Sequence, residues 1–131
     1  MSSENPMNQS QVENIAKFTI GVFGIIFDSE GKVLLVHRTD YDLWNLPGGR
    51  LESSESPWEG VIREIKEETG FKAEVIKIVG VSFKPNKDNI VFTFLCKITG
   101  GQATLNKEAD KIEYFEINKI PPNTVPKQVE R

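Results

Sequence analysis

The sequence predicts an α+β domain in which strands precede and follow one central helix. Runs of strand length, rich in β-branched and aromatic residues, occur at 18–27, 32–37, 73–83, 89–97 and 111–117. The only strongly marked helix lies between the second and third runs, at about 57–69. Because strands and helices do not alternate regularly, this order favours an α+β or mixed-sheet sandwich over a doubly wound parallel fold.

The first two strands are predicted to form a hairpin. Phe18–Phe27 and Lys32–His37 flank the turn cluster Asp28-Ser29-Glu30-Gly31. A short turn-rich link between two strand-like runs is typical of antiparallel neighbours.

The helix has a start and a stop signal in the sequence. Ser56 is suited to the N-cap, Pro57 to the first helical position, and Glu59 completes a capping box. Gly70 supplies a C-terminal stop. We therefore predict a helix from about Pro57 to Thr69.

The two ends of the chain differ from its centre. Residues 1–15 are polar and show no periodicity, so they are expected to be a flexible tail. Residues 16–131 are expected to form a single domain, since the chain has only 131 residues. The final PPNTVPKQVER resembles the beginning of a further helix.

Composition limits the class of protein. The net charge of −3 argues against nucleic-acid binding by charge alone. The single Cys96 lies in the apolar run IVFTFLC and is expected to be a buried strand residue. No apolar stretch has the length of a membrane span and no signal peptide is present, so a cytoplasmic protein without a membrane partner is expected.

Glutamates crowd around the predicted helix. Like charges three or four positions apart on a helix repel by roughly 0.2–0.5 kcal/mol per pair, so a cation is expected among them. On a helical projection Glu64, Glu67 and Glu68 share one flank, beside an apolar stripe that begins at Trp58. Gly60 lies on the same flank, where a cation or a phosphate could approach. The six carboxylates of the segment are Glu52, Glu55, Glu59, Glu64, Glu67 and Glu68.

An acidic, solvated helix face is the alternative interpretation. It accounts poorly for Glu52 and Glu55 just before the helix and for the Gly48-Gly49 pair. A glycine loop that approaches a ligand and carboxylates that hold a divalent ion explain all of these features together. Oxygen-only ligands suit Mg²⁺ or Mn²⁺. The residues therefore indicate metal-dependent phosphate chemistry.

The same segment resembles the signature of the Nudix hydrolases. That signature is a glycine, five residues, a glutamate, seven residues, and then Arg-Glu-hydrophobic-x-Glu-Glu-x-Gly-hydrophobic. The resemblance extends over roughly Phe18 to Pro122, and the chain differs from many relatives in having Ser54 before the first glutamate. The matching positions are Gly49, Glu55, Arg63, Glu64, Ile65, Glu67, Glu68, Gly70 and Phe71.

The resemblance implies an α/β/α sandwich around a mixed sheet and an Mg²⁺-dependent pyrophosphohydrolase, with Mn²⁺ as a substitute. Water would attack phosphorus in a small nucleotide, either an ADP-ribose-like nucleoside diphosphate derivative or a (d)NTP. Glu67 and Glu68 would be the main metal ligands, with Glu64 a further ligand or the base. The Gly49 carbonyl would join the metal shell near Glu55, and Arg63 would orient the glutamates.

Four residues are expected to contact the substrate: Arg38, Gly48, Glu52 and Glu108. The alternative for Arg38 is an ordinary surface arginine. Glu108 is either a further acidic site residue or one charge of the polar loop NKEAD. His37 has no partner histidine, and no catalytic role is expected for it.

Three classes of function remain open from the sequence. The leading one is the hydrolase, the second a non-catalytic nucleotide-sensing module, and the third an acidic helix that binds a partner. The retained glutamates favour the first over the second, and the glycine loop disfavours the third. A homodimer is compatible with the sequence, which does not determine the oligomeric state.

Overall fold

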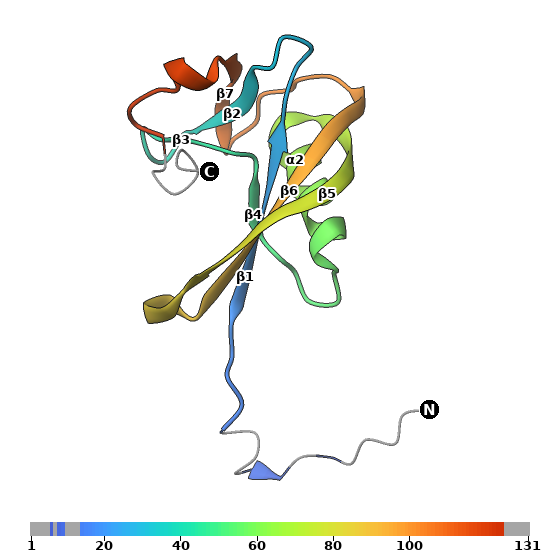
Figure 1. Cartoon of the computed structure of the whole chain (residues 1–131), viewed down its shortest axis with the longest axis vertical. Coiled ribbons are helices and arrows are strands. Elements are labelled where there is room, and N and C mark those ends of the chain that lie inside the picture. The colour runs from blue at the N-terminus through green and yellow to red at the C-terminus, as the bar shows by residue number, and fades with distance from the viewer. Residues whose placement is uncertain (1–5, 7, 10–13, 125–131) are drawn as a thin grey trace.

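The computed structural model describes residues 6, 8, 9 and 14–124, and in this range one helix packs against two sheets (Figure 1). One sheet has the strand order β4-β1-β6-β5 and the other β3-β2-β7. The bounds are β1 Thr19–Ile26, β2 Val33–Arg38, β3 Trp44–Asn45, β4 Gly48–Arg50, α2 Pro57–Thr69, β5 Phe71–Lys84, η1 Pro85–Lys87, β6 Asn89–Gly101, β7 Ala109–Phe115 and η2 Ile117–Lys119. The α+β class with a mixed sheet is confirmed. Most of the predicted tail, residues 1–15, and most of the predicted C-terminal helix lie outside the described residues.

The predicted hairpin of the first two strands is wrong. β1 pairs in parallel with β6 along its whole length and antiparallel with β4. Both edges of β1 are therefore occupied, and β2 belongs to the other sheet, where it pairs with β3 and β7. Beside the turn, an antiparallel bridge joins Phe27 and Val33, and the Asp28 amide donates to the Lys32 carbonyl oxygen at 2.9 Å.

Helix α2 spans the predicted residues, and its ends are formed as expected. The Glu59 amide donates to the Ser56 hydroxyl, and the Glu59 carboxylate accepts from the Ser56 amide. Gly70 ends the helix with φ +82°, a left-handed conformation that favours glycine. These local signals suffice because capping depends on residues only three positions apart.

Helix α2 packs on β1, β5 and β6 through a compact apolar core. Val61 and Ile65 are fully buried against Val22, Ile26 and Phe94. Gly24 of β1 allows this close approach, since a Cβ there would lie 2.9 Å from Ile65 Cδ1. Cys96 is buried in the same core, as predicted, and burial raises the pKa of its thiol to about 11.

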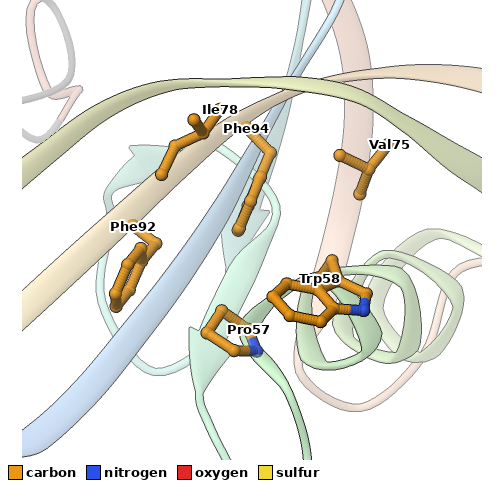
Figure 2. Close-up of a pocket in the computed structure, with 6 residues that line it drawn as sticks. All are labelled: Pro57, Trp58, Val75, Ile78, Phe92 and Phe94. Atoms are coloured by element: carbon orange, nitrogen blue, oxygen red, sulfur yellow. The ribbon is translucent and has the colours of Figure 1, made fainter.

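Trp58 departs from the predicted apolar stripe because its side chain is 58% exposed. It lies in the first turn of α2, at one side of an open apolar pocket of about 460 Å³ (Figure 2). Strands β5 and β6 form the opposite side of that pocket, so the Trp58 ring meets an opening instead of a packed wall. The lining residues are Pro57, Trp58, Val75, Ile78, Phe92 and Phe94.

The second core cluster lies around β2 and β3, beside an ionic contact of His37. Leu35, Trp44 and Leu46 are buried there. The His37 ring is also buried, at 5.1 Å from the Trp44 ring, and each of its nitrogens lies 2.7 Å from a carboxylate, of Asp42 or of Asp110. The hydrogen bond with Asp42, followed by that with Asp110, raises the pKa of His37.

This contact should make folding stability depend on pH. A raised pKa means that the folded state favours protonated His37, so its contribution is complete below about 6.5 and is lost as pH rises through the higher folded value. We expect the difference in urea midpoint between the wild type and His37→Gln to shrink from pH 6 towards pH 9. A pH-independent difference would show that His37 contributes by packing alone.

No helix in the described part of the chain is both long enough and apolar enough to cross a bilayer.

Candidate active site

The Gly48-Gly49 pair forms strand β4 and brings the backbone close to both β1 and the helix. A Cβ at Gly48 would collide with the Val22 carbonyl oxygen, and a Cβ at Gly49 would collide with the Glu64 carboxylate. Gly48 is therefore needed for strand packing, whereas Gly49 leaves room for an acidic side chain. Sequence patterning does not identify β4 as a strand, because its pairing with β1 is non-local.

Glu68 is anchored to this glycine pair. Its Oε1 accepts a hydrogen bond of 2.9 Å from the Gly48 amide. Burial, with the nearby charges of Glu64 and Glu108, raises the pKa of the Glu68 carboxyl to about 8, although the Gly48 amide and Arg38 act in the opposite direction. Ionisation of a carboxyl group buried in this way is energetically unfavourable unless a cation lies next to it.

Glu64 lies against Gly49 on the same side of α2. Its side chain is only 13% exposed, and burial is the largest cause that raises the pKa of its carboxyl. Arg63 Nη1 lies 3.4 Å from Glu64 Oε2 and partly offsets this effect. Glu64 and Glu68 thus form a pair of partly buried acids beside the glycine backbone.

Arg63 holds the outer carboxylates of the segment. Its guanidinium makes a bidentate contact with Glu55, at 2.6 Å from Nε and 3.0 Å from Nη2, and also donates to Glu67 Oε1 at 3.0 Å. Nη2 donates to the Arg50 carbonyl oxygen at 3.1 Å as well. The hydrogen bond from Arg63 is the main cause that lowers the pKa of Glu55. These contacts fix the positions of Glu55 and Glu67 relative to Arg63.

Glu55 and Glu67 are therefore ion-paired with Arg63 in this structure. Glu67 is largely exposed, and the more distant Glu52 Oε2 lies 3.6 Å from Arg63 Nη1. In the described part of the chain, no three His, Cys, Asp or Glu side chains form a ready-made metal cluster. The predicted ligands that do meet are Glu64, Glu68 and Gly49.

The predicted approach of a cation beside Gly60 is not available. A Cβ at Gly60 would lie 2.5 Å from Leu51 Cδ1 and 3.0 Å from Glu55 Oε1, so this part of the helix is covered. The helical projection could not reveal this contact, because it places residues around one helix and omits the loop that packs on it.

The site passes a simple chemical test for a divalent ion. Glu64 and Glu68 offer carboxylate oxygens and Gly49 a backbone carbonyl, and these donors suit a hard cation such as Mg²⁺. The partly buried acidic pair has no cationic partner as close as that of Glu55, which makes bidentate contacts with Arg63. A bound cation would offset the electrostatic repulsion between the Glu64 and Glu68 carboxylates.

Asn106 supports the site but was not identified from the sequence. Its amide nitrogen donates to the Glu67 and Glu68 carbonyl oxygens at 3.2 and 2.8 Å, which ties the following loop to the end of α2. Its side-chain oxygen accepts from the Glu108 amide. Glu108 is thereby placed close enough that its charge raises the pKa of Glu64 and Glu68. An asparagine in a polar loop carries no signal for such a long-range contact.

Arg38 is one of the residues that line a pocket together with Gly49. Its guanidinium makes two hydrogen bonds with Asp40, at 2.9 and 2.7 Å, and lies 5.4 Å from the centre of the Tyr41 ring. The pocket has a volume of about 440 Å³, and we call it the basic pocket because Arg38, Arg50, Lys84 and Lys87 line it. The other lining residues are Thr19, Gly21, Phe23, Gly49, Asn89 and Val91.

The fold and the site together define an α+β domain with a capped acidic helix beside a glycine pair, the arrangement of a candidate divalent-metal site. The chain belongs to the Nudix family: the family model described as the NUDIX domain matches residues 17–130. Nudix hydrolases use divalent metal ions, and the acidic pair is consistent with that requirement.

Curated relatives carry two kinds of name. A Bacillus subtilis protein named "Putative 8-oxo-dGTP diphosphatase" is 38% identical over 109 residues, which cover 83% of this chain and 70% of the relative. An ADP-ribose pyrophosphatase of Methanocaldococcus jannaschii is 35% identical over 109 residues, with 78% and 64% covered. The chain thus spans about two thirds of the length of these relatives.

Two solved structures share the fold over most of this chain. A UDP-X diphosphatase has a TM-score of 0.80 and 30% identity, with 95% of this chain and 69% of that chain covered. An ADP-ribose pyrophosphatase from Streptococcus suis has a TM-score of 0.74 and 27% identity, with 87% and 88% covered.

Proposed function

We propose that the protein hydrolyses the diphosphate linkage of a nucleoside diphosphate derivative or a (d)NTP, with Mg²⁺ as cofactor and water as the nucleophile at phosphorus. The observation that carries this proposal is that the partly buried carboxylates of Glu64 and Glu68 lie against the Gly48-Gly49 pair, and that Gly49 also lines the basic pocket. The names of the relatives support both substrate types.

We assign the metal to Glu64, Glu68 and the Gly49 carbonyl. Glu67 would become a further ligand if its contact with Arg63 is broken. Glu55 would remain near the metal without changing its contact with Arg63. When bound, Mg²⁺ would neutralise the diphosphate and lower the pKa of an attacking water. Mn²⁺ has the same preference for oxygen ligands and should substitute.

The other residues have positioning and binding roles. The Gly48 amide holds Glu68, and Arg63 sets the loop that carries Glu55 against α2. We assign the acceptance of the proton from the attacking water to Glu64 or to Glu108. We assign Arg38, which lines the basic pocket, to the diphosphate, and Glu52, which lies beside Arg63, to the metal-bearing side.

A non-catalytic nucleotide sensor on the same fold is the alternative. Both can be compared by assaying ADP-ribose, a UDP-sugar, dGTP and 8-oxo-dGTP with Mg²⁺ and then with Mn²⁺. Turnover that requires the metal supports the hydrolase, whereas metal-dependent binding without turnover supports the sensor. Reaction in ¹⁸O-labelled water should place label in a phosphate product, and unlabelled products would exclude attack of water at phosphorus.

A further inference from the structure

The basic pocket lies on the face of the sheet opposite α2. Successive side chains of a strand point to opposite faces, and Val22 and Ile26 of β1 point into the core beneath the helix. Gly21 and Phe23 therefore lie on the other face, where both line the pocket. Gly21 leaves its floor open, while Phe23 provides an aromatic wall.

The charge of this pocket is unusual for this chain. The protein has 19 acidic residues against 16 lysines and arginines, yet four of those cations line the pocket and no acidic residue does. Of the four, Arg38 is paired with Asp40. Asp88 follows Lys87 in the turn but is not part of the lining. Such a concentration of one sign favours an anionic ligand.

The two lysines lie at the end of the pocket away from the glutamates. Lys84 ends β5 and Lys87 ends η1, in the turn before β6. This turn is fastened to the start of β1: the Thr19 amide donates to the Asp88 carbonyl oxygen at 3.0 Å, and Asn89 Nδ2 donates to Thr19 Oγ1 at 2.7 Å. The lysines are thereby held near Thr19.

The strand register gives the span of the pocket. Gly49 is opposite Val22 and Arg50 opposite Gly21, while Asn89 is opposite Thr19. Three residues of extended strand separate Val22 from Thr19, which is a distance of about 10 Å. A third phosphate of a nucleoside triphosphate would remain near the first two, so the lysine end suits an anion on a different part of the substrate.

We propose that the preferred substrate is a diphosphate compound that carries a separate anionic group, a phosphate monoester or a carboxylate, on the moiety beyond the cleaved linkage. This inference rests on the proposed function for the position of the diphosphate at Arg38 and Gly49. Arg50, Lys84 and Lys87 bind the separate anion, and Phe23 contacts the part of the substrate between the two charged groups.

The test compares substrates that differ only in that group. ADP-ribose with ADP-ribose 1″-phosphate, which carries the phosphate on the ribose beyond the diphosphate, probes a phosphate, and UDP-glucose with UDP-glucuronate probes a carboxylate. We expect kcat/KM to be at least about tenfold higher for the anionic member of one pair, since a single charge-assisted contact can supply that factor. The preferred pair identifies the source of the anion, and the preference should decrease at high ionic strength.

Variants of the pocket lysines test whether Lys84 and Lys87 cause the preference for the anionic substrate. In Lys84→Gln/Lys87→Gln the preference should fall to about onefold while kcat/KM for the uncharged member stays within about twofold. Lys72→Gln/Lys97→Gln, which removes two exposed lysines of β5 and β6 that do not line the pocket, is the control and should retain the preference. Lys87→Gln alone provides a milder variant if the double variant has a lowered melting temperature.

Binding separates this inference from the proposed reaction. Dissociation constants for the same pairs, measured by calorimetry with Ca²⁺ in place of Mg²⁺, do not require turnover. Tighter binding of an anionic member in Ca²⁺, together with no hydrolysis of any of these compounds in Mg²⁺ or Mn²⁺, would refute the hydrolase and retain the inference. Equal affinities and equal kcat/KM in both pairs, or a preference that persists in the lysine double variant, would refute the inference.

Discussion

Glu68→Gln is expected to lower turnover with Mg²⁺ by at least about 100-fold and to leave the metal-free protein as stable as the wild type or more stable. The loss of activity follows because a carboxylate assigned to the metal becomes a neutral amide, and such ligands contribute several kcal/mol to transition-state stabilisation. The structural contact can survive, since the amide oxygen can still accept from the Gly48 amide.

The stability effect has a defined pH window. Burial raises the pKa of Glu68 from 4.5 to about 8, so the folded protein keeps a proton that the unfolded chain releases. Wild-type stability therefore falls as pH rises between these two values, whereas glutamine does not titrate. In EDTA at pH 9 we expect the variant to be more stable by on the order of 2 kcal/mol, with a smaller difference at pH 5.

Urea unfolding in EDTA and initial rates in Mg²⁺ measure the two effects on the same preparation. Glu74→Gln is the matched control, because it removes one exposed carboxylate from β5 and should change neither rate nor stability appreciably. A Glu68→Gln protein that is strongly destabilised in EDTA would show that the carboxylate is structural. Full activity would remove Glu68 from the proposed metal site.

Local signals predicted the helix well and the sheets less well. Caps at Ser56 and Gly70 act within a few residues, so the predicted bounds agree with those of α2. The pairing of β1 with β6 joins residues about 70 positions apart, and no local pattern specifies it. β3 and β4 have only two and three residues, too few to show a period.

The candidate site was predicted in composition more than in geometry. Spacing placed Glu64 and Glu68 on one side of the helix, and both meet the glycine pair in the structure. Arg63 and Glu67 are four positions apart on the helix, and their contact follows from spacing. Spacing could not show that Glu55 contacts Arg63, because that ion pair depends on how the loop folds back. Lys84 and Lys87 were missed for the same reason, since only the strand register brings that turn towards Gly49.

Arg63→Leu is expected to lower stability by about 2 kcal/mol and also to reduce turnover. The Arg63 and Glu55 side chains are 22% and 14% exposed, so removal of the guanidinium leaves a largely buried carboxylate without its bidentate partner. Leucine keeps apolar volume but releases Glu67 and the Arg50 carbonyl oxygen. Arg63→Lys keeps a charge without the planar geometry and should lie between the two.

A double-mutant cycle with Glu55→Gln assigns this loss to the ion pair. If the bidentate contact carries the effect, the two single changes should be less than additive, with a coupling of about 1–2 kcal/mol in urea unfolding at pH 7. Arg63 lowers the pKa of Glu55, so the contribution is complete above the usual glutamate value and is lost as pH falls through the folded value. The wild type and Arg63→Leu should therefore converge towards pH 3. Additive changes, or a difference that persists in acid, would instead assign the role of Arg63 to packing of its aliphatic part against the loop.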